Sequence, residues 1–540
     1  MNGKAGRDLT RRQALARAGG LGAAAMIAGS ASSPPGWARL IERAAAVRRA
    51  GSDLGAIDHI VLLMMENRSY DCYFGAYPRG RGFDDHPRRS LGLFAQDYPG
   101  GANVYPKHKL LPFHLDQQCQ NDPIHDWGPM HLCWDTGRMD AWVKTHTMSQ
   151  YEGADGTTVM GYYGRRDLAF YYALADHFTL CDHYHCSVLG PTHPNRLMWM
   201  TGTIDPHGAH GGPITDTNAN PNLRWTCTWR TMPEVLEDQG VSWKVYNPSN
   251  VGVSGKYAAL ASDPTWNPEL YNPTTNPIVM FTSDQVLPYF KAFELPTSPL
   301  YRKAFQQTFP GDFVSDVKAG KLPSVSWITP PQGFDEHPSA SPARGMYFTS
   351  LVLGALMTNP AVWAKTALFV CHDENGGFFD HVRPATPPPG TRGEYLTAPP
   401  QGGNPTPDTL GIKGPVGLGV RVPMLVISPF SHGGHIVSDV LDHTSQLKLI
   451  AERFGVTVPN GSSWRRHRVG DLTTTLFRSR HNARVPKLPP IVIPTHGACD
   501  SNDQNTELGG AATPVPKQQR MPRQGGGSRP ASYYFGSHRR

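Results

Sequence analysis

The sequence has no long apolar run in its body and few charged residues for its length. Charged residues make up 18% of the 540 residues, and no run after the N-terminal region approaches the roughly 18 apolar residues that cross a membrane. Neither a Gly-X-Y period nor sustained heptads occur, which excludes collagen and coiled coils. The chain is 39% apolar and contains 56 Gly and 50 Pro. It is therefore expected to form a large buried core with many turns and long loops.

The body of the chain has no net basic charge, because the excess of Lys and Arg over Asp and Glu lies at the two ends. Residues 1–50 hold nine Lys or Arg against two Asp or Glu, and residues 517–540 hold six against none. The formal charge of +7 for the whole chain therefore leaves −6 on residues 51–516. Nucleic-acid-binding proteins concentrate basic residues on the folded domain. Nucleic acid is not an expected partner.

The N-terminus is typical of an export signal. Arg11 and Arg12 precede a mild apolar stretch, Ala18 to Ala31, which is too short to span a bilayer as a stable helix. Twin arginines before a short stretch of small residues resemble a Tat signal, whereas the alternative is a basic start with no targeting role. We expect residues 1–50 to be a signal and linker. The mature protein would then be secreted or associated with the cell envelope, without a transmembrane segment.

No Cys-X-X-Cys pair occurs among the eight cysteines, so a structural zinc site is not indicated. The even number permits disulfides in an exported protein. Sequence separation favours Cys119 with Cys133 and Cys181 with Cys186. The alternative is that several of these residues are small buried side chains.

Three short apolar runs predict buried strands, and polar residues follow each of them directly. The runs are Ile60–Met65, Ala367–Cys371 and Val422–Ile427. Such near-continuous apolar strands predict a sheet that is covered on both faces. Ligands of open α/β sheets bind beyond the carboxyl ends of the strands. We therefore expect residues 66–68, 372–374 and 428–435 to converge on one site.

The rest of the body alternates helices with long loops. Residues 445–455 predict a helix, with Leu447, Ile450, Ala451 and Phe454 on one face and Gly455 at its end. Residues 384–410 are rich in Pro and Gly, which is typical of a lid or substrate wall or, alternatively, of a solvated connection. We place the folded domain at residues 51–484. The tail, 485–540, is rich in Pro, Gly and Arg, and we expect most of it to be disordered.

Acidic and amide side chains at two of the strand ends suggest a metal site. Glu66-Asn67 follows the first strand and Asp373-Glu374 follows the second. Oxygen ligands of this kind suit hard divalent cations. Adjacent buried carboxylates repel each other, and a cation offsets that repulsion. For Glu66-Asn67, the alternative is a turn closed by side-chain hydrogen bonds.

A hydroxyl and two histidines complete the candidate chemistry. In Gly190-Pro-Thr-His-Pro-Asn-Arg196, Thr192 stands where a helix begins. Free N–H groups at a helix N-terminus attract phosphate, so Thr192 is a candidate nucleophile, and the alternative is an ordinary helix cap. His125 and His337 lie in compact polar-aromatic segments. Either could donate to phosphate oxygens or protonate a leaving alkoxide.

Together these motifs resemble the bacterial phospholipase C and acid phosphatase family. The segments that carry the resemblance, in order and at compatible spacing, are Glu66–Asp71, Asn121–Trp127, Gly190–Arg196, Val241–Tyr246, Asp373–Val382, Arg421–Pro423 and Asp442–Ser445. They cover roughly residues 55–485 and are most similar to the mycobacterial-type phospholipases C. The resemblance implies an α/β/α sandwich of the alkaline-phosphatase superfamily type, and hydrolysis through a covalent phospho-enzyme.

The resemblance also implies a role for each site residue. Glu66, Asn67, Asp373 and Glu374 would bind one divalent metal ion, which the oxygen-type ligands leave open as Ca²⁺, Mg²⁺, Mn²⁺ or Zn²⁺. Thr192 would be the nucleophile, and His125 and His337 would contact the transferred phosphoryl group. Related acid phosphatases have Ser at the position of Thr192. They also have a further active-site histidine, for which residues 211–336 offer no counterpart.

The implied activity is that of an exported phospholipase C. Its substrates would be phosphatidylcholine-like lipids, met transiently at a membrane surface. Its products would be diacylglycerol and a phosphorylated head group. A choline head group calls for an aromatic cage, with candidates Trp127, Trp134, Trp142, Tyr162 and Tyr163. Two alternatives remain: a broad-specificity acid phosphomonoesterase on the same fold, and a non-catalytic envelope protein that binds lipid head groups.

Overall fold

The structure, a computed structural model, describes most of the chain. The described residues are 37–46, 51–85, 91–148, 156–217, 223–248, 284–331, 333–401, 409–492 and 514–530. Arg11, Arg12 and the apolar stretch of the expected export signal lie outside them. Among the described residues, no helix is long and apolar enough to cross a membrane.

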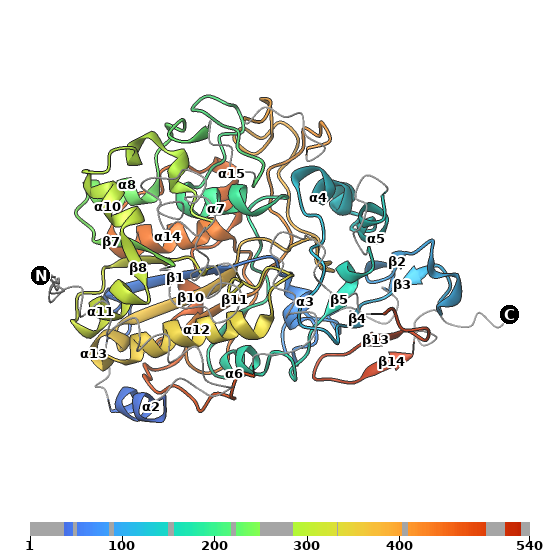
Figure 1. Cartoon of the computed structure of the whole chain (residues 1–540), viewed down its shortest axis with the longest axis horizontal. Helices are drawn as coiled ribbons and strands as arrows, with labels where there is room; N and C mark the ends of the chain where they lie inside the picture. Colours follow the sequence, from blue (N-terminus) through green and yellow to red (C-terminus); the bar gives the residue numbers. More distant parts are fainter. Residues whose placement is uncertain are drawn as a thin grey trace, which may run out of the picture.

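An eight-stranded mixed sheet forms the centre of the molecule (Figure 1). From edge to edge its order is β12 (Ile436–Val437), β6 (Thr179–Cys181), β11 (Met424–Ile427), β10 (Thr366–His372), β1 (His59–Met65), β9 (Val325–Ile328), β7 (Trp243–Pro248) and β8 (Gln307–Phe309). The strands β10, β1, β9, β7 and β8 run parallel to one another. The predicted strands at 60–65, 367–371 and 422–427 are β1, β10 and β11.

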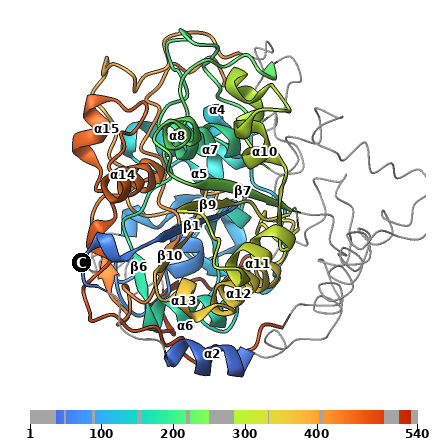
Figure 2. The ribbon, with the colours of Figure 1, turned by 90° about the vertical axis from the view of Figure 1, so that its left-hand side faces the viewer.

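Alternate residues of β1 are buried on opposite faces of the sheet, which gives the molecule two cores. Val61, Leu63 and Met65 belong to one apolar cluster, whereas Leu62 and Met64 belong to the other. The first core is covered by α2 (Trp37–Ala45), α6 (Ala169–His177), α11 (Gly311–Lys318), α12 (Pro342–Met357) and α13 (Pro360–Trp363). The second is covered by α7 (Thr192–Thr201), α8 (Met232–Asp238), α10 (Pro299–Phe305) and α14 (His443–Phe454). Figure 2 shows the two helical layers, so the predicted α/β/α sandwich is confirmed.

The expected convergence of three strand ends is only partly right. β1 and β10 are parallel, and their carboxyl ends lie side by side. β11 is antiparallel to β10, and Ser428 Oγ at its end donates to the carbonyl oxygen of Thr366, where β10 begins. Residues 428–435 therefore lie at the end of the sheet where β10 begins, opposite the end that carries the candidate site. A short apolar run carries no signal of strand direction, which is why the prediction failed.

The two motif-bearing helices differ from expectation only at their N-termini. α14 starts at His443 because Asp442 caps it, and it ends at Gly455, whose φ of 68° is left-handed. α7 starts at Thr192, with Pro191 in the cap position. Thr192 is therefore the first helical residue and not the cap.

Smaller helices and two separate strand pairs lie beyond the sheet, at the end where the carboxyl termini of β1 and β10 lie (Figure 1). The helices are α3 (Tyr70–Phe74), α4 (Trp127–Trp134) and α5 (Trp142–His146). The short strand pairs are β2 (Gln96–Asp97) with β3 (Lys109–Leu110), and β4 (Phe113–His114) with β5 (Gly161–Tyr162). α15 (Ser463–Arg468) follows α14 in the chain.

The tail is more ordered than its composition suggests. Residues 520–522 and 528–530 form an antiparallel pair, β13 and β14. Gln519 Oε1 accepts from the backbone N–H of Leu111, and the Gln524 amide donates to the carbonyl oxygens of Tyr77 and Gly80. The side chains of Leu488 and Ile491 are buried against the domain. Residues 514–530 are thus an ordered part of the tail, because long-range contacts hold a segment of low apolar content.

Neither predicted disulfide forms. Cys133, Cys181 and Cys186 are free buried thiols, and burial raises the pKa of Cys133 to about 12. Cys119 is disulfide-bonded, but not to Cys133. Proximity in sequence was therefore a poor guide, and most of the cysteines are small core residues.

Candidate active site

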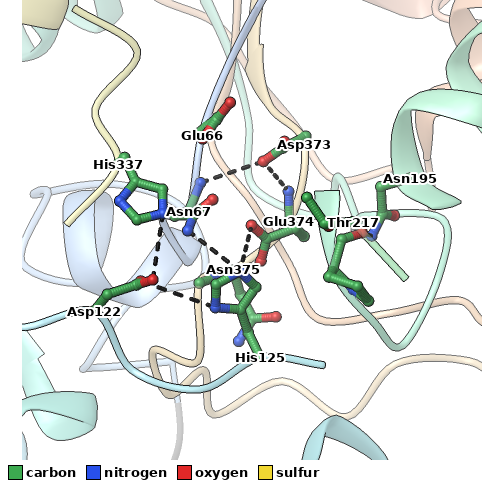
Figure 3. A network of polar contacts seen from close by, with 12 residues as sticks. Glu66, Asn67, Asp122, His125, Asn195, Thr217, His337, Asp373, Glu374 and Asn375 are labelled. Atoms are coloured by element: carbon green, nitrogen blue, oxygen red, sulfur yellow. Dashed lines mark hydrogen bonds and ion pairs between the residues drawn. The ribbon is translucent and has the colours of Figure 1, made fainter. Parts of the chain in front are cut away.

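The candidate site is built where β1 and β10 end side by side. Asp373 donates its backbone N–H to the carbonyl oxygen of Met65 at 3.0 Å, which continues the pairing of the two strands. Two residues after Met65, the N–H of Asn67 donates to Asp373 Oδ1 at 3.2 Å. Glu66, Asn67, Asp373 and Glu374 are all buried, and Figure 3 shows that they surround a common space. The structure therefore brings the four predicted metal ligands together. We call them the site cluster.

The backbone at Asn67 is left-handed, which turns its side chain into the site. Its φ is 59°, a region that Asn enters more readily than most residues. Gly376 lies directly against it with a φ of 56°, and a Cβ on Gly376 would lie 2.5 Å from the Cβ of Asn67. Only a residue without a side chain allows this approach, which explains the glycine after Asp373-Glu374-Asn375.

Arg196 links α7 to one carboxylate at the end of each strand. Its Nη2 is 3.1 Å from Glu66 Oε1, and its Nε is 3.1 Å from Asp373 Oδ2. Residues four apart share one face of a helix, so Thr192 stands on the same face of α7 as Arg196, one turn closer to the helix N-terminus. Thr192 is 4% exposed. The predicted nucleophile therefore lies one helical turn before the guanidinium that contacts Glu66 and Asp373.

The turn before α7 is held by Asn195. Its Oδ1 accepts from the N–H groups of Ser187 and Val188, and its Nδ2 donates to the carbonyl oxygens of Gly190 and Pro191. These bonds satisfy the irregular backbone that leads into the helix. They also fix where Thr192 stands relative to the sheet.

His125 and His337 approach the site from two loops and share one carboxylate. His125 Nε2 lies 3.6 Å from Glu374 Oε1 and 3.4 Å from Asn67 Nδ2. Asp122 lies between the two imidazoles, with Oδ1 3.9 Å from His125 Nδ1 and Oδ2 3.3 Å from His337 Nε2 (Figure 3). Both predicted histidines therefore belong to the same polar network as the site cluster.

The site buries more carboxylates than cationic groups, and this imbalance shifts the pKa values of several residues. Burial raises the pKa of Glu374 to about 8, with His125 opposing the shift. Burial acts against protonation of His125, yet Glu374, Asp122 and Asp126 raise its pKa to about 10. Burial and the neighbouring Asp284 raise the pKa of Glu66 well above its ordinary value. Such groups call for compensating positive charge.

Two oxygen atoms of the site cluster fit a cation. Asn67 Oδ1 and Glu374 Oε1 are buried and have no hydrogen-bond partner among the described residues, and the nearest cationic group to Glu374 Oε1 is His125, 3.6 Å away. Glu66 also lies in a group with Asp284 and Asp335 whose ligand atoms are all within 4.8 Å of one another. Buried oxygens without hydrogen bonds, beside excess carboxylate, suit a hard divalent ion. The donor set is thus compatible with a divalent metal and does not identify it.

A second buried cluster lies further along the same two segments and has a different character. We call Asp71, Asp380, His381 and Arg421 the paired cluster. Arg421 lies 3.1 Å from Asp71 Oδ1 and 2.9 Å from Asp380 Oδ1, and His381 Nδ1 lies 2.7 Å from Asp71 Oδ2. Its carboxylates meet a fixed guanidinium and backbone N–H groups. The paired cluster is therefore an internal ion-pair network.

Sequence reasoning missed several contributors to the site. Arg196, Asp122, Asp284 and Asp335 were not singled out as functional residues. Their positions depend on contacts between residues far apart in the sequence. Arg196 and Glu66 are separated by 130 residues, and His337 and Asp122 by 215, and motif spacing does not encode such contacts. Only Arg196 carried a signal, because it lies four residues after Thr192 in the same motif.

Three of the five rings proposed for an aromatic cage lie in the core. Trp127, Trp142 and Tyr163 are almost completely buried, and Trp127 Nε1 donates to the carbonyl oxygen of Ile412. Tyr163 OH donates to the carbonyl oxygens of Gln117 and Gln118. These rings belong to the core, so they are not available to surround a choline group.

Comparison with known proteins shows the family to which the chain belongs. The model of the phosphoesterase family matches residues 57–457, which include all seven predicted site residues. The chain belongs to the phosphoesterase family. Phospholipase C B of Mycobacterium tuberculosis (strain H37Rv) is 42% identical over 537 residues, covering 96% of each chain.

Other members are more distant. Non-hemolytic phospholipase C of Burkholderia pseudomallei is 39% identical and covers 90% of this chain and 67% of its own. Non-specific phospholipase C5 of Arabidopsis thaliana is 26% identical over 72% of this chain and 67% of its own.

Among solved structures, a Pseudoalteromonas sulfatase, PsFucS1, aligns over 84% of this chain and 77% of its own, with a TM-score of 0.31 and 11% identity. A protein of the alkaline phosphatase superfamily from Vibrio parahaemolyticus aligns over 81% and 78%, with a TM-score of 0.27 and 10% identity.

Proposed function

We propose that this phosphoesterase is a phospholipase C that acts through a phosphorylated Thr192. Its substrates are phosphatidylcholine-like lipids, and its products are diacylglycerol and a phosphorylated head group. Identity of 39–42% with relatives named phospholipase C supports the activity. The observation that supports the mechanism is that Thr192 begins α7 one turn before Arg196, whose guanidinium contacts Glu66 and Asp373.

The reaction divides into two displacements at phosphorus. Thr192 Oγ attacks the phosphorus atom, and the bond from phosphorus to the diacylglycerol oxygen breaks. The proton that Thr192 loses is balanced by the proton that the diacylglycerol oxygen gains. Water then attacks the phosphothreonine, the bond from phosphorus to Oγ breaks, and Thr192 regains a proton as the phosphorylated head group leaves.

The surrounding residues orient the phosphoryl group and stabilise its charge. The N-terminus of α7 lies at Thr192, and its helix dipole favours negative charge there, although Pro194 has no N–H and the N–H of His193 donates to Thr217 Oγ1. Because Asp122 lies between His125 and His337, both imidazoles are held at one side of the site. There they can donate to phosphoryl oxygens and pass a proton to the leaving alkoxide.

Glu66, Asn67, Asp373 and Glu374 would hold one divalent ion. When bound, such an ion supplies Lewis-acid stabilisation of the charge that develops on the phosphoryl oxygens. The protein's own contribution is to keep these four side chains rigid, through the N–H of Asn67 on Asp373 and through Arg196.

We extend the proposal to the setting of the enzyme. The twin arginines Arg11 and Arg12 support export through the Tat route, after which the enzyme would meet lipid transiently at a membrane surface. Fusion of residues 1–50 to a reporter tests the route. Export that persists when both arginines are changed to Lys would contradict it.

The test of the activity is phosphocholine release from phosphatidylcholine vesicles, with p-nitrophenyl phosphate hydrolysis measured in parallel. We expect release that a chelator stops, that disappears in Thr192→Ala and that partly returns in Thr192→Ser. Acid quenching of the wild type should trap radiolabelled phosphate on Thr192. Full activity of Thr192→Ala would overturn the covalent mechanism. Turnover of the monoester alone would favour an acid phosphomonoesterase, and head-group binding without turnover a non-catalytic protein.

A further inference from the structure

A basic cavity lies apart from the candidate active site. It has a volume of about 720 Å³, and its walls come from the loop after α3, from the segment after β10 and from α15. The lining residues that matter here are Arg81, His183, His381, Arg383, Trp464 and Arg468. No member of the site cluster lines it, and neither do Thr192, His125 or His337.

The charge of the cavity wall is positive and largely uncompensated. No Asp or Glu lines it among the described residues, and Arg383 and Arg468 form no ion pair within the described part of the chain. Arg81 does pair with Asp85, with Nε 3.1 Å from Oδ2. Arginines that converge without acidic partners leave a site for an anion.

The floor of the cavity is the paired cluster, whose charges balance one another. Buried Arg421 donates through Nη1 to the carbonyl oxygen of Arg81 at 2.8 Å, so the paired cluster lies directly beneath, and its guanidinium is balanced by Asp71 and Asp380. Burial together with Arg81 and Arg421 lowers the pKa of His183 to about 4, so this histidine adds no charge to the wall at neutral pH. The unbalanced positive charge of the wall therefore comes from Arg383 and Arg468.

We propose that this cavity binds the phosphate group of a small ester or of a lipid head group. Arginine forks match phosphate oxygens in geometry and charge, and Arg383 and Arg468 are free to make such contacts. The volume is within the range of small-molecule sites. Trp464 and Pro388 offer an apolar wall for the organic part of the ligand.

The test is calorimetric titration with inorganic phosphate and with sn-glycerol 3-phosphate. It compares the wild type, the double variant Arg383→Gln/Arg468→Gln, and Arg466→Gln. Arg466 is the matched control, because it lies on α15 but does not line the cavity. We expect the double variant to lose one phosphate site, with affinity at least about tenfold weaker, while Arg466→Gln keeps it. Unchanged phosphocholine release from phosphatidylcholine vesicles shows that the double variant is folded and that its active site is intact.

A second arm distinguishes the two sources of phosphate. Wild type and variants are sedimented with vesicles of phosphatidylglycerol and phosphatidylcholine, and with vesicles of phosphatidylcholine alone. Adsorption to the anionic vesicles that only the double variant loses assigns the cavity to a lipid head group. Loss of soluble phosphate binding without a change in sedimentation assigns it to a small ester. Equal phosphate binding by all three proteins, together with equal sedimentation, would overturn the proposal.

Discussion

The site cluster and the paired cluster use the same two chain segments and similar residues, yet they differ in how their charge is balanced. Asp71 and Asp380 meet Arg421, a guanidinium fixed at their centre. Glu66 and Asp373 share Arg196, but Asn67 Oδ1 and Glu374 Oε1 accept no hydrogen bond from the described part of the chain. The density of acidic residues is therefore a weak sign of function. A buried oxygen without a hydrogen bond is the stronger one.

The largest effect is expected from breaking the paired cluster. Arg421→Ala leaves Asp71 and Asp380 buried without their partner, which should lower the free energy of unfolding by about 3–5 kcal/mol. Urea denaturation measures this. The control is Arg165→Ala, which removes a half-exposed pair with Asp176 and should cost at most about 1 kcal/mol. Equal losses in the two variants would remove the distinction between the clusters.

Removing a carboxylate from the site cluster should affect activity and not stability. Glu374→Gln keeps the shape of the side chain but loses the charge that faces the proposed cation. We expect kcat/KM to fall roughly 10²–10³-fold. The free energy of unfolding in the presence of a chelator should change by less than about 1 kcal/mol, because the removed charge was already disfavoured by burial. A stable variant with full activity would show that Glu374 is no ligand.

A smaller loss is expected at Asp122, which touches both histidines. Asp122→Asn keeps a hydrogen-bonding side chain but removes the charge between them, and we expect activity to fall about 10–100-fold. A positioning role also predicts a shifted pH profile of kcat, which a merely structural role would not produce. Asp97→Asn, at an exposed aspartate paired with Lys109, serves as the control and should behave as wild type. An unshifted profile in Asp122→Asn would contradict the assignment.

The smallest effect concerns the pH dependence of the paired cluster. Burial opposes protonation of His381, but Asp71 and Asp85 raise its pKa above the ordinary value. A raised pKa stabilises the fold fully below the unfolded value of about 6.5, and this contribution is lost as the pH rises through the folded pKa. The stability advantage of wild type over His381→Asn should therefore be larger at about pH 5.5 than at about pH 9. An advantage that grows with pH would contradict the charge balance described here.

The comparison also shows what sequence reasoning could reach. β1 and β10 were predictable because each is a continuous apolar run that ends in polar residues, and the ligands follow directly from those ends. The direction of β11 was not predictable, since apolar composition is the same in either direction. Arg196 could have been found from its place one turn after Thr192. Asp122 could not, because only the tertiary fold brings it between His125 and His337.

The left-handed backbone of Asn67 places two separate demands on one position. The turn needs a residue that tolerates a positive φ, and the site needs a neutral oxygen beside Asp373 and Glu374. Glycine meets the first demand and fails the second, glutamine does the reverse, and aspartate adds a fourth carboxylate to the site cluster. Few side chains therefore fit this position. Asparagine meets both demands, since it tolerates a positive φ and supplies a neutral oxygen.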